Sequence, residues 1–256
     1  MKSIYDEITQ VTRSRRKAAL CIVTSVKGST PRKQGAKMIV YENSQIFGTI
    51  GGGDLEKRVI ENALEVIKTL KPTVFKHDLL HQHSMCCGGT VEIYIEPIMN
   101  KKRLYIFGSG HTGQALARFA VNFEFDIFVI DERKEYLDAL EIEGINKMNL
   151  EHNKALQALP FDNDVFIVIV THSHQIDRDI LAYCIKKPFT YLGMIGSERK
   201  VNITKKMFID GNIGTLEDLE KVHMPIGMDI SAETPEEIAI SILGEIIKVK
   251  NKVLND

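Results

Sequence analysis

The segments LYIFGSGHTGQALA (104–117), VIDER (129–133) and DVFIVIV (164–170) decide the fold of the C-terminal part of the chain. The first segment begins as an apolar strand, turns at glycines and continues with the spacing of a helix, which we expect over residues 112–123. The second ends another strand, expected over residues 126–130. The third is a continuous apolar run, which is typical of a parallel strand covered on both faces. Strands and helices that alternate in this way predict a doubly wound parallel sheet.

The glycine turn follows a strand, opens a helix and precedes an acidic residue at the end of the next strand. Gly108, Gly110 and Gly113 provide a tight turn whose backbone N–H groups approach a phosphate, and Asp131 is placed to accept a hydrogen bond from a ribose hydroxyl. This context is that of a dinucleotide-binding, Rossmann-like domain. The alternative is a Rossmann-like fold whose phosphate site is empty or reused for another ligand. His111 is bulky for a nicotinamide site and therefore favours a phosphate site that serves another ligand.

Two histidines follow the apolar strand in the segment THSHQID (171–177). In open α/β sheets this end of a strand lines the ligand cleft, so His172 and His174 are candidates for cofactor binding or proton transfer. Asp177 lies one position too late for a known metal-hydrolase pattern, and no third histidine follows, so we predict no metal site here. The simpler interpretation is that Asp177 caps the next helix and the histidines line the cleft.

The segment GMIGSERK (193–200) connects a further strand to a helix. Gly196, Ser197, Arg199 and Lys200 predict a second anion site on the same rim of the sheet, because cations at a helix start are otherwise unfavourable. The alternative is a solvated helix N-terminus.

The N-terminal half predicts a separate α/β domain over residues 1–98, joined by a polar linker with a proline to a second domain over residues 102–256. Its segment GTIGGGDLE (48–56) leads into a long helix. Gly51, Gly52 and Gly53 either leave backbone N–H groups free for an anionic or flat ligand or simply permit a sharp turn.

A second unusual loop, HQHSMCCGG (81–89), packs histidines and cysteines closely together. Its spacing fits no standard zinc template, so we predict no metal site. Cys87 and Cys86 are candidates for an exposed nucleophile or a sulfur carrier, and the alternative is an inert loop thiol. Cys21 and Cys184 lie in apolar segments and are expected in the core.

The composition restricts the classes of partner. The chain has 256 residues, 44% of them hydrophobic and 26% charged, and a net charge of -1 at pH 7, so we expect no nucleic-acid partner. No apolar run reaches the length of a membrane span, and the N-terminus lacks the apolar core of a secretory signal. Four cysteines without a C-x-x-C pair indicate reduced thiols and a cytoplasmic protein.

These motifs, in this order, resemble the xanthine dehydrogenase accessory factor family, also called XdhC/CoxI. The resemblance covers nearly the whole chain. It is carried by GSTPRKQGAKM (28–38), GTIGGGDLE (48–56), CCGGTVEIYIEP (86–97), LYIFGSGHTGQALA (104–117), VIDER (129–133), VTHSHQIDRDIL (170–181), YLGMIGSERK (191–200) and PIGMDISAETPEEIAISILGEI (225–246).

The resemblance implies an accessory protein rather than an enzyme. It implies binding of the molybdenum cofactor, protection of that cofactor during sulfuration by a cysteine desulfurase-type donor, and its insertion into a xanthine dehydrogenase-like molybdenum hydroxylase. It also implies a homodimer and a role for the Cys-Gly-Gly element at Cys87. Some relatives have a cysteine within the segment that matches residues 51–56, where this chain has Gly53 and Asp54.

Two other functions remain open on the residues alone. One is an NAD(P)-dependent oxidoreductase that uses the glycine turn and Asp131, in which Arg133 favours a 2′-phosphate. The other is a metal-dependent hydrolase or metal chaperone that uses His172, His174 and Asp177 or the loop at residues 81–87. The resemblance favours the accessory factor over both.

Overall fold

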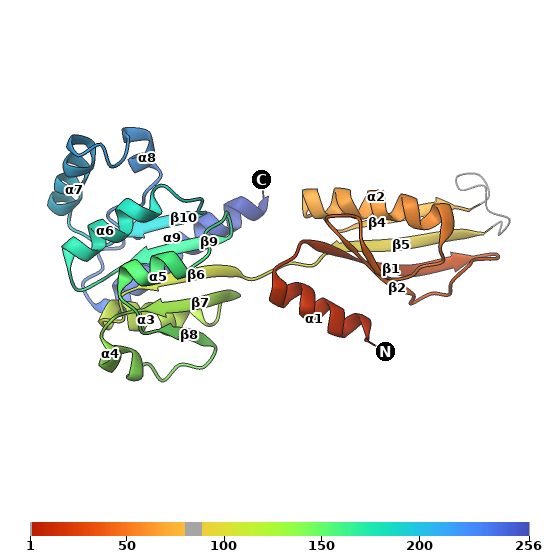
Figure 1. Ribbon diagram of the computed structural model, residues 1–256, viewed down its shortest axis with the longest axis horizontal. Coiled ribbons are helices and arrows are strands. Elements are labelled where there is room, and N and C mark those ends of the chain that lie inside the picture. The colour runs from red at the N-terminus through yellow and green to blue at the C-terminus, as the bar shows by residue number, and fades with distance from the viewer. Residues whose placement is uncertain (1, 80–88, 256) are drawn as a thin grey trace. The chain divides into compact units, whose positions relative to one another are not determined.

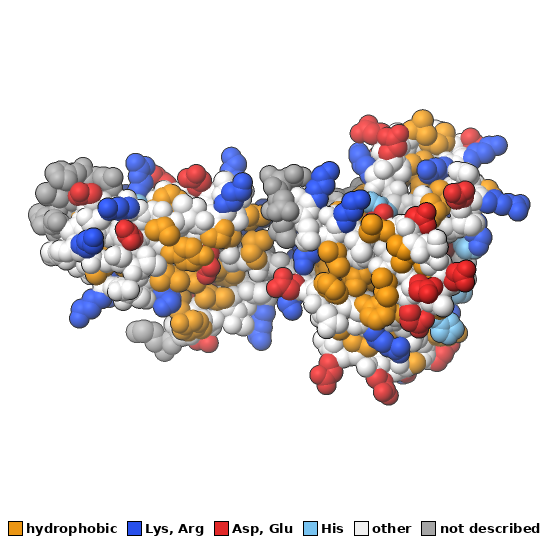
Figure 2. Space-filling model, turned by 180° about the vertical axis from the view of Figure 1, so that it is seen from behind, with side chains coloured by type: hydrophobic (Ala, Val, Ile, Leu, Met, Phe, Trp, Pro, Cys, Tyr) orange, Lys and Arg blue, Asp and Glu red, His pale blue; other side chains and the backbone are white. Residues whose placement is uncertain are grey.

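A computed structural model describes residues 2–79 and 89–255. The chain divides into two compact units, Met1–Asn100 and Lys101–Asp256, and the division falls within the predicted linker. Among the described residues no helix is both long and apolar enough to cross a membrane. Basic and acidic side chains lie interspersed on the visible face of each unit (Figure 2), in keeping with the small net charge.

The N-terminal unit is a five-stranded antiparallel sheet with one helix on each face (Figure 1). The sheet order is β3-β2-β1-β5-β4. Its elements are α1 (Ile4–Ser14), β1 (Ala18–Lys27), β2 (Lys37–Tyr41), β3 (Ile46–Gly48), α2 (Gly53–Thr69), β4 (Thr73–Asp78) and β5 (Thr90–Pro97).

Alternation along β1 explains the two layers. Ala19, Cys21 and Val23 pack in the core under α2, whereas Ala18 and Leu20 point to the opposite face and pack with α1. The helix α2 contributes a buried stripe at helical spacing, formed by Leu55, Val59, Ala63 and Val66.

The C-terminal unit is the predicted doubly wound sheet, so the predicted fold class is confirmed (Figure 1). Its strands are all parallel and follow the order β10-β9-β6-β7-β8. Its elements are β6 (Lys102–Phe107), α3 (His111–Ala120), β7 (Phe125–Ile130), α4 (Lys134–Asp138), β8 (Ile145–Met148), α5 (His152–Ala158), β9 (Val165–Ile169), α6 (His174–Cys184), β10 (Tyr191–Met194), α7 (Glu198–Asp210), α8 (Leu216–Glu220) and α9 (Pro235–Asn255).

The inner strand β9, between β10 and β6, is buried along its whole length, as its apolar sequence predicts. Phe166 and Val168 enter the core formed with α3 and α9, while Val165, Ile167 and Ile169 enter the core formed with α5 and α6. Because the chain leaves β6 toward β7 on one side and returns to β9 on the other, the order of strands reverses between β6 and β9. In such sheets the ligand crevice lies at the carboxyl ends of these two strands.

Candidate functional site

A pocket occupies the predicted place at the carboxyl ends of β6, β7 and β9. We call it the switch-point pocket. It is lined by Phe107, Gly108, Ile130, Asp131, Glu132, Leu150, His152, Thr171, His172, Ile176 and Ile180. The strand ends supply Gly108, Asp131 and His172, which the sequence predicted. The apolar wall from Leu150, Ile176 and Ile180 was missed, because it depends on where α5 and α6 pack.

Two glycines of the turn, Gly110 and Gly113, have different surroundings. A Cβ atom at Gly113 would lie 1.9 Å from the carbonyl oxygen of Gly108, so Gly113 permits close packing between α3 and the end of β6. A Cβ atom at Gly110 would meet no heavy atom within 4 Å, and Gly110 is the N-cap of α3. The open approach to the helix N-terminus is therefore at Gly110, next to the exposed His111. The first N–H groups of α3 have no acceptor within the helix and suit an anion there.

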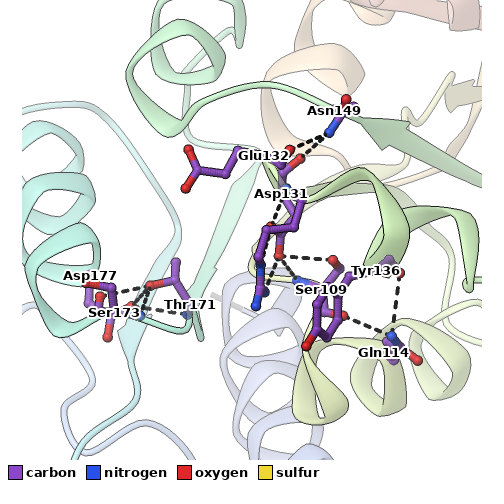
Figure 3. Close-up of polar contacts among 10 residues, drawn as sticks. Ser109, Gln114, Asp131, Glu132, Tyr136, Asn149, Thr171, Ser173 and Asp177 are labelled. Carbon is purple, nitrogen blue, oxygen red and sulfur yellow. Dashed lines mark hydrogen bonds and ion pairs between the residues drawn. The ribbon is translucent and has the colours of Figure 1, made fainter.

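Asp131 is bound by the protein's own donors (Figure 3). Its Oδ2 accepts from the Ser109 N–H at 2.8 Å, from the Ser109 hydroxyl at 3.0 Å and from Arg133 Nη2 at 2.8 Å. Its Oδ1 accepts from the Arg133 backbone N–H and from Arg133 Nε, both at 3.0 Å. The Arg133 guanidinium in turn stacks on the ring of Tyr136.

Five donors exceed the roughly four lone-pair positions of a carboxylate. Burial alone raises the pKa of Asp131, but the hydrogen bonds from Arg133 and Ser109 outweigh it and hold the pKa well below the usual range. Ser109 and Arg133 therefore bind the Asp131 carboxylate in this conformation, and its role toward a ribose hydroxyl stays a prediction. Arg133, proposed for a 2′-phosphate, is paired with Asp131 instead.

The two histidines at the start of α6, His172 before the helix and His174 at its first residue, lie in different pockets. Thr171 donates to Asp177 Oδ1 from its N–H at 3.1 Å and from its hydroxyl at 2.6 Å (Figure 3). Asp177 thereby ties the loop to the first turn of α6, close to the capping role considered for it. His172 lines the switch-point pocket, whereas His174 lines a second pocket. Among the described residues no group of three or more His, Cys, Asp or Glu side chains is arranged to hold a metal ion.

The second pocket lies between α6 and α7, and we call it the α6–α7 pocket. Its lining residues are His174, Asp177, Arg178, Met194, Ile195, Lys200, Ile203 and Thr204. Lys200 therefore belongs to it, at the start of α7, where Ser197 is the N-cap and Gly196 precedes. Arg199 is exposed on the same turn. Of the predicted ligand-binding residues of this unit, Gly108, Asp131 and His172 thus line the switch-point pocket, and His174 and Lys200 line the α6–α7 pocket.

The glycine run of the N-terminal unit binds an internal carboxylate. Glu56 Oε1 accepts hydrogen bonds from the N–H groups of Ile50 at 3.1 Å, Gly51 at 3.3 Å and Gly52 at 2.9 Å. The Thr49 hydroxyl donates to the same oxygen. The expectation that the N–H groups of Gly51 and Gly52 are free for a ligand is therefore wrong, because Glu56 accepts from both.

Three sequence motifs of the N-terminal unit nevertheless lie together. A Cβ atom at Gly51 would lie 2.5 Å from Pro31 Cγ, and one at Gly89 would lie 2.3 Å from the Ser29 carbonyl oxygen. The GSTPR segment is therefore in contact with both the glycine run and the residue that ends the loop at 81–89. Gly53 has open space where a side chain would stand.

The predicted thiols Cys86 and Cys87 lie outside the described residues, as do His81 and His83. Cys21 and Cys184 are buried in the cores, as predicted. Burial raises the pKa of both thiols to about 12, so neither is a nucleophile at neutral pH.

The structure defines a class of protein with two units, the second of which is a Rossmann domain. The glycine turn of this domain is open at Gly110, and its acidic residue, Asp131, accepts hydrogen bonds from Ser109 and Arg133. The chain belongs to the XdhC and CoxI family. Residues 104–246 match the XdhC Rossmann domain, and residues 11–78 match the domain described as the XdhC and CoxI family.

Two curated relatives are similar over long stretches. The uncharacterized protein YqeB of Escherichia coli K12 is 33% identical over 255 residues, which are 97% of this chain and 46% of that protein. A protein of Bacillus subtilis 168, described as a probable subunit of xanthine dehydrogenase, is 29% identical over 165 residues, which are 64% of this chain and 48% of that protein. The chain thus spans about half the length of these relatives.

A crystal structure from Bacillus halodurans, described as a xanthine dehydrogenase, has a similar fold. It is 20% identical with a TM-score of 0.53, and the match covers 96% of this chain and 95% of that one. At this level of identity the likeness concerns the fold alone.

Proposed function

We propose that the protein is an accessory factor of a xanthine dehydrogenase-like molybdenum hydroxylase and that its Rossmann domain holds the molybdenum cofactor as cargo. Membership of the XdhC and CoxI family supports the accessory role, as does the Bacillus subtilis relative described as part of a xanthine dehydrogenase.

The main observation in support of molybdenum cofactor binding is the open helix N-terminus at Gly110. The molybdenum cofactor has a phosphate and a flat pterin. Free space over Gly110 admits an anionic oxygen to the first turn of α3. The adjoining pocket has apolar walls from Ile130, Leu150 and Ile176, which suit a flat ring. These two features support the molybdenum cofactor as the cargo.

The state of Asp131 favours this cargo over a nicotinamide dinucleotide. Dinucleotide sites of this fold use the acidic residue for the ribose hydroxyls. Here Ser109 and Arg133 occupy that carboxylate, so a ribose must displace them. A phosphate and pterin need no such exchange. An NAD(P)-dependent oxidoreductase, supported by the strand order and the glycine turn, is the second candidate.

The finer parts of the proposal concern sulfur and assembly. We assign to Cys87, with Cys86 beside it, the receipt of sulfur from a cysteine desulfurase-type donor, followed by insertion of the cofactor into the client enzyme by a homodimer. If cells that carry the double variant Cys86→Ser/Cys87→Ser still produce fully mature client enzyme, the two thiols have no role in sulfur transfer.

The test is anaerobic purification after co-expression with the cofactor pathway, followed by molybdenum analysis and release of pterin as a fluorescent oxidation product. We expect both near one per chain. Gly110→Asp should lower the pterin content about tenfold or more, because it places a carboxylate against the phosphate. Gly110→Asn is the matched control, because Asn and Asp are equally good N-caps and differ in charge.

Absence of molybdenum and pterin, together with a bound nicotinamide, supports the oxidoreductase. Equal pterin content in Gly110→Asp and the unmodified protein places the cargo elsewhere than at α3.

A further inference from the structure

Two adjacent carboxylates at the end of β7 have different surroundings. Asp131 accepts all the hydrogen bonds described above from Ser109 and Arg133. Glu132 is exposed and lines the switch-point pocket, and its carboxylate has no hydrogen-bond or ion-pair partner among the described residues. In Figure 3 this carboxylate extends away from Asn149, toward the side on which α6 lies. Glu132 therefore offers free acceptor oxygens to a ligand in the pocket.

Asn149 fixes the backbone that carries Glu132. Its Nδ2 donates to the carbonyl oxygen of Asp131 at 3.1 Å and to that of Glu132 at 2.9 Å (Figure 3). The next residue, Leu150, lines the same pocket, as does His152 at the start of α5. The loop before α5 therefore holds the end of β7 beside one wall of the pocket, and a backbone that is already ordered lowers the entropic cost of binding a ligand.

The other polar side chains that line the pocket are less suited to a ligand with two adjacent donors. Thr171 is engaged by Asp177, to which it donates from its N–H and its hydroxyl. A neutral imidazole, whether of His152 or of His172, has one acceptor nitrogen. With Asp131 saturated, the Glu132 carboxylate is the group among the described lining side chains that can accept from two adjacent donors at once.

The ring of a pterin presents such a pair of donors. Its 2-amino-4-oxopyrimidine part has a ring N–H beside an amino group, and two parallel hydrogen bonds from these groups to a carboxylate are charge-assisted. A guanine base, which occurs in dinucleotides, has the same edge. Ile130, Leu150 and Ile176 supply apolar walls for the faces of a flat ring.

We propose that Glu132 determines the specificity of the switch-point pocket by binding the aminopyrimidinone edge of a pterin or guanine ring. The inference rests on the proposed cargo function and adds the side chain that distinguishes this ring from others of the same shape. An analogue with an oxo group in place of the amino group turns a carbonyl oxygen toward the carboxylate. It therefore loses a hydrogen bond and gains a repulsive contact.

The first test measures the pterin content of the full chain after co-expression with the cofactor pathway and anaerobic purification. Glu132→Gln should lower this content about tenfold or more, because the amide keeps one acceptor oxygen and presents a donor to the second donor of the ring. Glu135→Gln is the matched control, since it removes the same charge from an exposed position in the first turn of α4. Its pterin content should equal that of the unmodified protein.

Matched ligands test recognition of the ring edge without any substitution. Pterin and lumazine have the same two-ring shape and differ in the amino or oxo group at C2, and guanosine and xanthosine monophosphate differ in the same way. Fluorescence titration of the full chain measures the first pair, and calorimetry measures the second. We expect the amino compound of at least one pair to bind about tenfold more tightly than its oxo partner, and the pair with the larger preference identifies the ring. Glu132→Gln should remove the preference, whereas Glu135→Gln should keep it.

The outcomes separate this inference from the cargo function. Pterin in the unmodified protein and an equal amount in Glu132→Gln leave the cargo function standing and refute the role of Glu132. Absence of pterin from the unmodified protein contradicts the cargo function on which the inference rests. Equal affinities within both pairs, or saturation by none of the four ligands, also overturn recognition of the ring edge. Loss of NADH binding in Glu132→Gln with unchanged pterin content assigns the carboxylate to a ribose instead.

Discussion

The hydrogen bonds to Asp131 hold the glycine turn to the end of β7. Ser109 lies within the turn and Arg133 follows the strand, so the carboxylate connects two loops that both border the switch-point pocket. The connection is buried, with the Asp131 side chain 4% exposed. In buried networks the loss of one charged partner costs more than the net value of the pair, because the remaining donors stay unpaired.

This network predicts a pH dependence. The pKa of Asp131 in the folded chain is held below its usual value, so the unfolded chain binds the proton more readily. The resulting contribution to the free energy of unfolding is complete above the unfolded pKa of about 4 and is lost as pH falls through the lower folded pKa. Asp131→Asn should therefore lower stability at pH 7 and flatten its decline below about pH 5.

Urea denaturation of the full chain at a series of pH values measures this effect. Asp138→Asn, exposed on the neighbouring helix α4, is the control and should follow the unmodified protein. Coincident stability curves for Asp131→Asn and Asp138→Asn would show that the network contributes nothing to stability.

At the scale of elements, the glycine run before α2 acts as a binding nest for Glu56. Burial raises the pKa of Glu56, and the hydrogen bonds from Thr49 and the run's N–H groups more than compensate, so the pKa lies below its usual value. The helix α2 therefore receives its N-terminal acceptor from its own first turn.

Removal of this acceptor should destabilise the N-terminal unit. Glu56→Ala leaves the N–H groups of Ile50 and Gly52 and the Thr49 hydroxyl without this acceptor, whereas the Gly51 N–H keeps the Thr49 hydroxyl oxygen. We expect a loss of about 1–3 kcal/mol in the free energy of unfolding. Glu56→Gln keeps an acceptor oxygen and should lose less. Glu61→Ala is the control, because Glu61 forms an exposed pair with Arg58 on the same helix. A loss in Glu56→Ala no greater than that in Glu61→Ala would contradict the nest.

The same elements show what a sequence can predict and where it stops. The strand β9 was predictable, because it depends on a local apolar run. The capping box of α9 is equally local, since it depends on Thr234 and on Glu237 three residues later, which exchange two hydrogen bonds. The predicted helix at residues 112–123 ends at Ala120, since the next residues form a turn with bonds to Phe119 and Ala120.

Partners of loop residues were not predictable from their spacing. A glycine run indicates exposed N–H groups but not which carboxylate they bind, and no spacing rule singles out Glu56 as the acceptor. Likewise, His172 and His174 are two residues apart, and only the packing of α6 and α7 shows that they serve different pockets.

At the scale of the whole molecule, the hydrophobic cores follow the division of the chain. Two clusters draw on residues of the N-terminal unit and two on residues of the C-terminal unit. The sheets are likewise separate, one antiparallel and one parallel. Each unit thus has its own sheet and hydrophobic core, as a chain of about 100 residues or more needs to fold alone.

We therefore expect the fragments Met1–Asn100 and Lys101–Asp256 to fold independently. Each should unfold in one cooperative urea transition, and Asp131→Asn should shift only the transition of the second fragment, whereas Glu56→Ala should shift only that of the first. Circular dichroism of the separate fragments and of the full chain measures this. A fragment that lacks a cooperative transition, or a variant that shifts both, would mean that the units depend on each other for stability. Independent folding would allow the open turn at Gly110 to be studied in the Rossmann fragment alone, because the turn and the helix α3 lie beyond Asn100.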